Sequence, residues 1–274
     1  DELPDEFIEK VRTAVKRVSP EKFLLGEVWE DATTKFGFNK RRTYLLGKGL
    51  DSVMNYPFKN AVLDFVKGKP AEQAMTEILT ICEHYPAPAM DTALNFLSTH
   101  DTERALTVIA DEPANGRGRA WQSGRCVTGD AYEEGLLRLR MAYAIIYTLP
   151  GVPCLYYGDE IAMQGYRDPF NRAFFRWDAH EQRLRPVLAQ LAQLRHTCEA
   201  FRTGQLRVLR AEDGILHYQR VGKVETAEII VNRTEHIIVE TLASGKSTEV
   251  NPMGFTIVVE EVGHNPNHSY YDYV

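Results

Sequence analysis

Two carboxylates in the chain are placed where acid–base chemistry would need them. Glu27 and Asp101 each stand at the end of a short apolar run, and residues at the carboxyl ends of strands are the ones that reach a reaction site in a parallel α/β protein. Cleavage of a glycosidic bond uses two carboxyl groups: one gives a proton to the leaving oxygen, and another stabilises the positive charge that develops on the sugar. Glu27 and Asp101 are therefore candidate catalytic residues.

The neighbours of these carboxylates fit the same chemistry. Trp29, two residues after Glu27, offers an aromatic face on which a sugar ring can stack. His100, directly before Asp101, offers a polar group for a sugar hydroxyl. A strand ending in Glu-x-Trp is also consistent with a barrel rim closed by a surface acid and a packed indole, so the residues alone leave both interpretations open.

The elements that must position these residues are short strands alternating with helices. Apolar runs typical of buried parallel strands occupy residues 23–29, 51–56, 93–98 and 152–157. Apolar residues recur at helical spacing at 4–18, 58–66, 70–83, 132–149 and 183–198. This alternation predicts an α/β fold of the (β/α) barrel type, with the active site at the carboxyl ends of the strands. A closed barrel of this type has eight strands, so we expect residues 1–203 to form half of one.

The last part of the chain has a different pattern. From residue 204 it consists of short runs rich in Val, Ile, Leu and Thr, separated by turn signals such as Asp213-Gly214. These runs predict a small antiparallel β-sandwich domain over residues 204–262. We expect residues 263–274 to form a loose or irregular tail.

Composition argues against several kinds of partner. The net charge is −6, and no run of Lys or Arg is present that would follow a nucleic acid or an anionic membrane. No apolar run reaches the roughly 20 residues that span a bilayer. The four cysteines lie far apart and outside zinc-ligand spacing, which favours reduced thiols in a cytoplasmic protein. We expect no nucleic-acid partner, no membrane partner and no metal site.

Three separated motifs are informative together: Gly26 to Trp29, Asn95 to Asp101 and Gly151 to Glu160. In this order they resemble the motifs of the fifth, seventh and eighth barrel strands of glycoside hydrolase family 13, the α-amylase family. The resemblance implies that Glu27 is the general acid/base. It also implies that Asp101 with His100 grips the sugar at the cleavage site, and that the chain is the C-terminal half of a (β/α)8 TIM barrel, strands five to eight.

Further detail resembles the neopullulanase, cyclomaltodextrinase and maltogenic amylase group of that family. The stretch from Tyr166 to Arg172 matches the loop after the eighth strand. The resemblance implies that Asp168 and Arg172 bind glucose on the glycone side and that Trp29 lines the aglycone side. An ion pair between Asp168 and Arg172 that only fixes their loop is the alternative.

The resemblance finds no counterpart in this sequence for one catalytic group of the family. The retaining mechanism uses an aspartate nucleophile at the end of the fourth strand, two residues after an arginine, and the family pattern places Asp1 to Asp5 just past it. Because the nucleophile and the general acid act as a unit, we expect this polypeptide alone not to hydrolyse sugars.

The resemblance implies a retaining hydrolase of α-1,4-glucans such as cyclomaltodextrins, pullulan and maltooligosaccharides. No organic cofactor is expected, and any calcium would lie in the missing half. Two alternatives stay open: a 4-α-glucanotransferase, which passes the same intermediate to a sugar, and a non-catalytic carbohydrate-binding or interaction module. A homodimer of the full-length enzyme is compatible with the resemblance.

Overall fold

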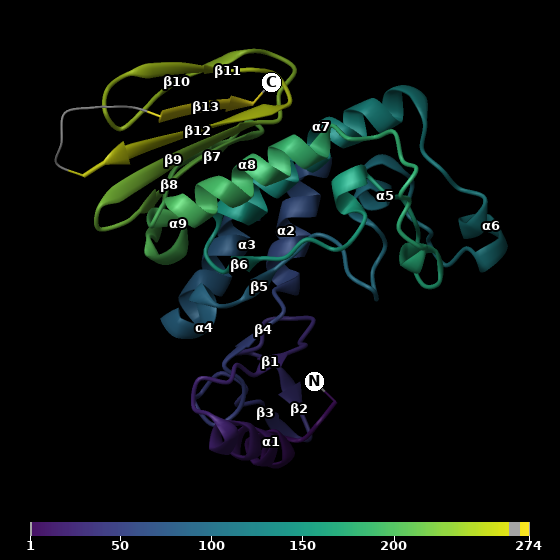
Figure 1. Cartoon of the computed structure of the whole chain (residues 1–274), viewed down its shortest axis with the longest axis vertical. Coiled ribbons are helices and arrows are strands. Elements are labelled where there is room, and N and C mark those ends of the chain that lie inside the picture. The colour runs from purple at the N-terminus through teal and green to yellow at the C-terminus, as the bar shows by residue number, and fades with distance from the viewer. Residues whose placement is uncertain (1, 263–268, 274) are drawn as a thin grey trace.

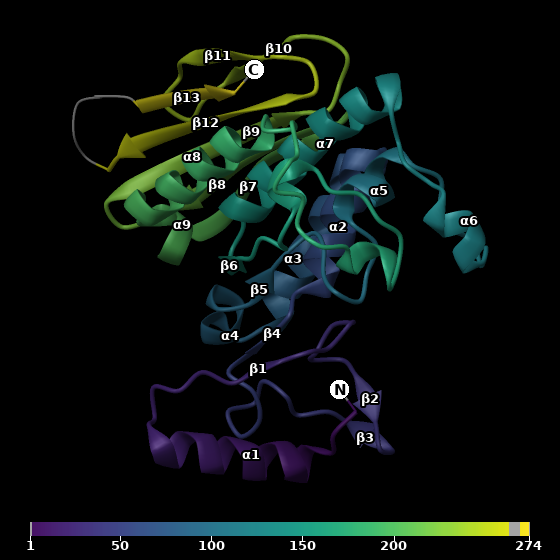
Figure 2. The ribbon, with the colours of Figure 1, turned by 45° about the vertical axis from the view of Figure 1, so that its right-hand side comes forward.

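The computed structural model describes residues 2–262 and the backbone of residues 269–273. Three parts follow one another along the long axis of the molecule (Figure 1). The N-terminal part holds α1 and β1 to β4, a helical layer built around α2 and α7 lies in the middle, and a β-sheet covers the other end. Figure 2 shows the same order from a second side.

Four two-residue strands form a parallel row through the first two parts: β1 (Leu25–Gly26), β4 (Ser52–Val53), β5 (Leu94–Asn95) and β6 (Val152–Pro153). β1 pairs with β4, and β5 pairs with β6. A parallel bridge between Met54 and Leu94 joins the two pairs. Parallel strands with helices between them are the arrangement of part of a (β/α) barrel. The strands are shorter than the predicted runs because each of these pairings extends over only two residues per strand.

The five predicted helices are present, with ends shifted by at most three residues: α1 (Asp5–Val18), α2 (Tyr56–Lys67), α3 (Ala71–His84), α7 (Gly129–Thr148) and α8 (Leu184–Thr197). Their ends follow ordinary capping chemistry. The Asn55 side chain accepts a hydrogen bond from the Phe58 N–H at the start of α2, and Gly68, with φ 131°, ends that helix. The structure adds four short helices that the periodicity does not predict: α4 (Ala87–Asp91), α5 (Ala105–Ala110), α6 (Arg119–Ser123) and α9 (Ala200–Thr203).

Ion pairs connect α1 to the rest of the N-terminal part. Arg12 and Lys16 of α1 contact the two oxygens of Asp51 at 2.7 and 2.9 Å. A hairpin of β2 (Phe36–Gly37) and β3 (Lys40–Arg41) follows β1 and brings Arg42 to 2.8 Å from Asp5. These contacts fix α1 across the strand that precedes Glu27.

The C-terminal part has two layers. A five-stranded antiparallel sheet has the order β13-β12-β9-β8-β7, and a hairpin of β10 and β11 lies on one of its faces (Figures 1 and 2). The bounds are β7 (Gln205–Glu212), β8 (Ile215–Val221), β9 (Glu225–Asn232), β10 (Ile238–Thr241), β11 (Ser247–Val250), β12 (Gly254–Glu261) and β13 (Ser269–Tyr273). Ile230 and Val258 of the sheet pack with Leu242 and Val250 between the layers.

The structure corrects the expected tail. Residues 269–273 form β13, which pairs antiparallel with β12, whereas residues 263–268 and 274 lie outside the described part. This segment carries three tyrosines, a residue type favoured in strands, and the available edge of β12 gives it backbone partners. None of the helices in the described ranges is long and apolar enough to cross a membrane.

The opposite face of the five-stranded sheet packs on the helices. Ile229 and Val231 of β9 belong to the same buried cluster as Ile145 and Leu149 around the end of α7. At this boundary Arg220 is fully buried; it donates to the carbonyl of Thr148 over 2.7 Å and to the carbonyl of Gly204. The sheet and the helical layer therefore share one core.

Candidate active site

Glu27 lies just beyond β1, beside an aromatic pair. The hydroxyl of Tyr56, at the start of α2, donates a hydrogen bond to Glu27 Oε1 over 2.7 Å. The ring of Trp29 stacks on the ring of Tyr56, with centroids 4.4 Å apart and planes 12° apart. Because β1 and β4 are parallel and paired, the residues that follow them meet at the same edge. Glu27 also lines a mostly apolar hollow of about 250 Å³ between α1 and β1.

The hydroxyl of Tyr56 interacts with both candidate carboxylates, through a hydrogen bond with Glu27 and electrostatically with Asp101. Its side chain is buried, and burial together with the hydrogen bond to Glu27 raises the pKa of Tyr56 well above its ordinary value. The negative charges of Glu27 and Asp101 both act in the same direction, so both carboxylates lie within electrostatic reach of this hydroxyl. Tyr56 therefore remains a neutral hydrogen-bond donor at neutral pH.

Asp101 is the centre of a second cluster, in the loop after β5. Its Oδ2 lies 3.1 Å from His100 Nε2, and its Oδ1 accepts a hydrogen bond from Arg172 Nη2 over 3.0 Å. Arg172 Nε lies 3.1 Å from Asp168 Oδ1 and donates to the carbonyl of His100 over 2.8 Å. The structure therefore brings His100, Asp101, Asp168 and Arg172 together. All four side chains are partly exposed, so a ligand can reach them.

Asn171 fixes the loop that carries Asp101. Its side chain is fully buried, and its Nδ2 donates to the carbonyls of Thr99, His100 and Thr102 at 3.2, 2.7 and 2.8 Å. Since Asn171 precedes Arg172, the same short segment positions the backbone of the Asp101 loop and places a cation on its carboxylate.

Arg104 ties the same loops to the helical layer. The buried guanidinium lies over the rings of Tyr156 and Tyr157, at 4.6 and 4.8 Å from their centroids. It donates to the carbonyl of Asn171 over 3.1 Å and pairs with buried Asp159 at 3.1 Å. Asp159 in turn accepts a hydrogen bond from Tyr143 of α7 over 2.6 Å. The polar residues that follow β6 thus include a structural network in addition to any ligand contacts.

The sequence contains one Arg-x-Asp pattern, Arg176-Trp177-Asp178, in the loop after η2 (Phe170–Arg172). Arg176 and Asp178 form an exposed ion pair with each other at 3.0 Å. They follow no strand, so this pattern is not the nucleophile motif. In the described ranges no group of three His, Cys, Asp or Glu side chains is arranged to hold a metal ion, and each of the four cysteines is a free thiol.

Tyr56, Asn171 and Arg104 are the residues whose roles the sequence pattern does not show. The position of Tyr56 in the sequence could have indicated a role in the site, because Tyr56 follows β4 as Glu27 follows β1. For Asn171 and Arg104 the pattern gave no such signal, because their partners are brought in by the fold: backbone carbonyls for Asn171, and a carbonyl, Asp159 and two tyrosine rings for Arg104. Together the site has two carboxylates on different loops, Glu27 after β1 and Asp101 after β5, beside an aromatic face and a cluster of charged side chains. Such a set of groups suits a ligand made of hydroxyl groups.

Comparison with known proteins identifies the class. Residues 3–200 match the model of the alpha-amylase family described as "Alpha amylase, catalytic domain". The chain belongs to this family of glycoside hydrolases, family 13.

Individual relatives identify the group. The chain is 32% identical over 240 residues to a cyclomaltodextrinase of Geobacillus thermopakistaniensis, covering 85% of this chain and 35% of that protein. It is 29% identical to neopullulanase 2 of Thermoactinomyces vulgaris, covering 90% of this chain and 38% of that protein. A solved cyclomaltodextrinase structure is 29% identical with a TM-score of 0.72, covering 88% of this chain and 37% of that one. The chain therefore falls in the neopullulanase, cyclomaltodextrinase and maltogenic amylase group, and it spans about a third of the length of these relatives.

Proposed function

We propose that this chain is the acid/base-bearing half of a retaining glycoside hydrolase that acts on α-1,4-glucans such as cyclomaltodextrins, pullulan and maltooligosaccharides. Glu27 protonates the leaving oxygen and then activates water. Asp101 and His100 hold the hydroxyls of the sugar at the cleavage site. Asp168 and Arg172 hold the glycone side, and Trp29 lines the aglycone side.

The observation that carries this proposal is the cluster around Arg172. Arg172 contacts Asp101 and Asp168 within 3.1 Å, although Asp101 lies far from both in sequence. A charged pair of this kind can also fix a loop. Here both carboxylates and the guanidinium keep exposed surface, so each retains positions for sugar hydroxyls.

The parallel row supports an assignment to the second half of the barrel. In this proposal β1, β4, β5 and β6 are strands five to eight, and the β-sheet part is the C-terminal domain, packed on the barrel half through the core that they share. None of the strands in the described part of the chain ends in the Arg-x-Asp pattern of the nucleophile. A polypeptide with the acid but without the nucleophile loses nearly all of the rate.

Binding and turnover test the proposal separately. Calorimetry with acarbose should show binding to this chain that Asp101→Asn and Arg172→Ala each weaken at least tenfold. Arg176→Ala is the matched control, because Arg176 is an exposed arginine of the next loop whose ion-pair partner is Asp178. Unchanged acarbose binding in Arg172→Ala would contradict the assignment of the sugar site.

For turnover, the chain should be fused to the N-terminal half of a cyclomaltodextrinase and assayed with β-cyclodextrin. We expect maltose release from the fusion, loss of that activity in Glu27→Gln, and no release by the 274-residue chain alone. Hydrolysis by the chain alone that depends on Glu27 would overturn the division of roles between the two halves.

A further inference from the structure

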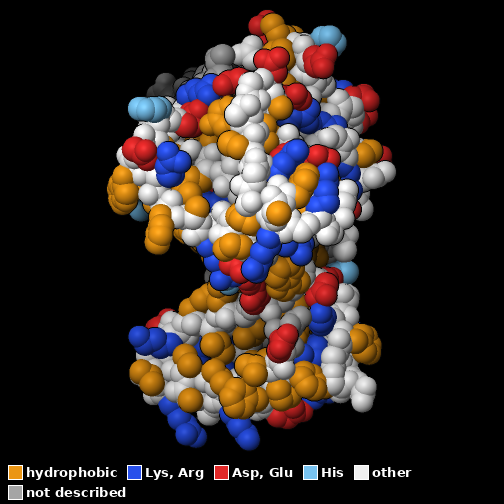
Figure 3. Space-filling view, turned by 90° about the vertical axis from the view of Figure 1, so that its right-hand side faces the viewer, with side chains coloured by type: hydrophobic (Ala, Val, Ile, Leu, Met, Phe, Trp, Pro, Cys, Tyr) orange, Lys and Arg blue, Asp and Glu red, His pale blue; other side chains and the backbone are white. Residues whose placement is uncertain are grey.

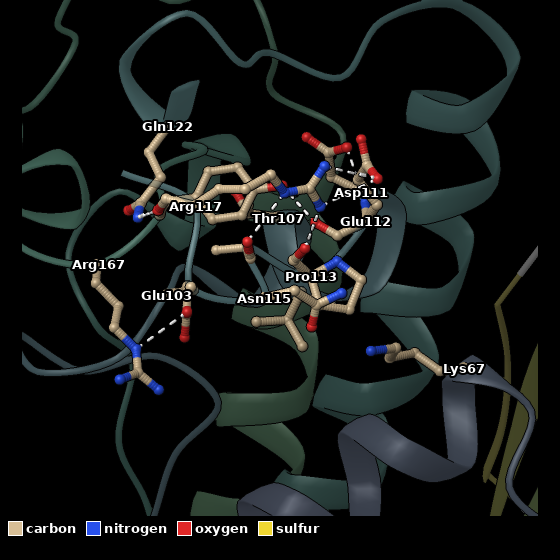
Figure 4. Close-up of a pocket in the computed structure, with 14 residues that line it drawn as sticks. Lys67, Glu103, Thr107, Asp111, Glu112, Pro113, Asn115, Arg117, Gln122 and Arg167 are labelled. Carbon is tan, nitrogen blue, oxygen red and sulfur yellow. Dashed lines mark hydrogen bonds and ion pairs between the residues drawn. The ribbon is translucent and has the colours of Figure 1, made fainter. Parts of the chain in front are cut away.

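A second cavity, of about 600 Å³, lies outside the candidate active site. It is bounded by the end of α2, by α5 and by the polar segment 111–117 (Figure 4). This volume falls within the roughly 300–1,000 Å³ of ligand pockets. The segment that closes it is the Gly-rich stretch between α5 and α7, which plays no part in the proposed active site.

The cavity borders the loops that carry the candidate active site. Glu103 and Arg167 line it and pair with each other at 3.1 Å, as Figure 4 shows. Each is close in sequence to an active-site residue: Glu103 is two residues from Asp101, and Arg167 directly precedes Asp168. The two loops therefore contribute side chains to both the candidate active site and this cavity.

Internal hydrogen bonds hold the 111–117 segment in place. The hydroxyl of Tyr166 donates to the carbonyl of Glu112 over 2.6 Å, and Gln122 Nε2 donates to the carbonyl of Arg117 over 2.8 Å. The guanidinium groups of Arg117 and Arg125 lie 3.7 and 4.6 Å from the centroid of the Trp121 ring. A wall built in this way is largely formed before any ligand arrives, which lowers the entropic cost of binding.

The charges around the cavity are mostly neutralised by one another. Glu112 pairs with Arg117 at 3.1 Å, and Asp111 forms an ion pair with Arg125. A charged ligand would have to compete with such pairs. A neutral ligand with hydroxyl groups does not have to break these ion pairs, because a paired guanidinium keeps N–H donors and a paired carboxylate keeps lone pairs for further hydrogen bonds.

Other lining groups complete a surface suited to a sugar. Lys67 points into the cavity (Figure 4) and takes part in no ion pair within the described ranges. Asn115 adds an amide that both donates and accepts hydrogen bonds. Val108, Pro113 and Ala114 supply apolar surface for the C–H faces of a sugar ring.

We propose that this cavity is a second binding site, distinct from the catalytic one, for a short neutral oligosaccharide. The preference for a neutral ligand rich in hydroxyl groups follows from the paired charges. The choice of an α-glucan as that ligand rests on the proposed function.

NMR titration of the 274-residue chain with maltotriose tests the two sites separately. The backbone amide of Gly116 reports on the cavity, and the indole N–H of Trp29 reports on the candidate active site. Ala114→Trp should fill the cavity and abolish the Gly116 response while the Trp29 response remains. Ala120→Trp is the matched control, because Ala120 is an exposed residue of α6 outside the lining. Lys67→Ala should weaken the cavity affinity about three- to tenfold, whereas Lys10→Ala, on the exposed side of α1, should leave it unchanged.

Each result has one meaning. A Trp29 response without a Gly116 response overturns the second site and leaves the proposed function standing. A Gly116 response without a Trp29 response supports the second site and counts against the proposed function. A Gly116 response to maltotriose that survives in Ala114→Trp, or a response to inorganic phosphate in place of maltotriose, overturns the inference.

Discussion

At the scale of residues, the hydroxyl of Tyr56 acts on Glu27 as Arg172 acts on Asp101. Each supplies a hydrogen-bond donor to one oxygen of a candidate carboxylate and leaves the rest of that carboxylate for other partners. The tyrosine is held by its own neighbours, since its ring is stacked on Trp29 and meets Phe96 edge to face at 4.9 Å. We therefore regard Tyr56 as a positioning residue for Glu27.

The first prediction concerns this hydrogen bond. In a double-mutant cycle of Tyr56→Phe and Glu27→Ala, followed by urea unfolding, the two changes should be coupled by about 1 kcal/mol, because either one alone removes the same hydrogen bond. Tyr85→Phe, which removes a hydroxyl bonded to the Ala32 N–H, is the control and should not couple to Glu27→Ala. Additive effects of Tyr56→Phe and Glu27→Ala would show that the hydroxyl does not hold the carboxylate.

At the scale of elements, Arg104 links three of them. Its guanidinium joins the loop after β5, the turn after β6 and the segment that holds Asn171, and Asp159 carries the connection to α7. In the structure Arg104 stands at the N-cap of α5, a helix that the periodicity of the sequence does not predict. Its side chain, however, is fully buried and organises the loops of the candidate site.

The second prediction follows from that burial. Arg104→Met should lower the free energy of unfolding by about 3–5 kcal/mol, because it leaves Asp159 as an uncompensated buried charge. Combining it with Asp159→Asn should restore part of the loss, since the remaining charge is removed as well. Chemical denaturation measures both. A loss in the single variant below about 1 kcal/mol would mean that the pair is not needed for the loops to fold.

The sheet holds a second buried network, around His217. Its Nε2 lies 2.6 Å from Glu228 Oε1 and its Nδ1 lies 3.2 Å from Glu240 Oε2, so the side chain joins β8 to β9 and to the β10–β11 hairpin. Burial tends to raise the pKa of Glu228, but hydrogen bonds from His217, Gln219 and the Ala243 N–H outweigh it, and the pKa of Glu228 is lowered.

The third prediction is a pH dependence with a fixed sign. A carboxylate whose pKa is lower in the folded state than in the unfolded state stabilises the fold above its unfolded pKa of about 4.3, and this stabilisation is lost as the pH falls through its folded pKa. The difference in unfolding free energy between wild type and Glu228→Gln should therefore be constant from about pH 6 to 7 and shrink below about pH 4. Thermal unfolding across this range measures it. Glu249→Gln, at an exposed position of β11, should show no such trend.

Elements built on periodicity could be predicted from the sequence, and elements built on tertiary contacts could not. The spacing of Phe7, Ile8, Val11 and Val15 is enough to predict α1, and the run before Glu27 marks the position of β1. Segment 269–273 was expected to be irregular because the pattern does not show that β12 has an edge for it. In the site, motif resemblance locates Asp168 and Arg172, whereas the roles of Asn171 and Tyr56 depend on hydrogen bonds that only the fold creates.

At the scale of the whole molecule, one group of exposed apolar side chains lies on the N-terminal part. Figure 3 shows them gathered there, below the narrow waist of the molecule. Phe7 of α1 and Phe23 are each about half exposed, and Leu25 of β1 is 37% exposed. The stripe of α1 thus buries only Ile8 in the described residues, so most of its apolar face remains open to another surface.

The fourth prediction concerns this surface. Sedimentation velocity of the 274-residue chain should show self-association that increases with protein concentration. The double variant Phe7→Ser, Phe23→Ser should reduce it, because it removes the two large exposed rings. The corresponding control, Phe174→Ser, removes a still more exposed ring from the loop after η2 and should have little effect. Association that is unchanged in the double variant would place the contact elsewhere.

The contact of Arg220 with the end of α7 has a consequence for recombination between relatives. The interface between the helices and the sheet lies inside a single packed core. Arg220 donates a hydrogen bond to the carbonyl of Thr148 there, and Ile145 and Ile229 belong to one buried cluster. A crossover at residue 204 divides the chain at a turn but separates side chains that pack against one another. A chimera that takes its sheet from a cyclomaltodextrinase would need the matching outer face of α7 as well. The segment that can be exchanged as a unit therefore includes α7 as well as the strands of the sheet.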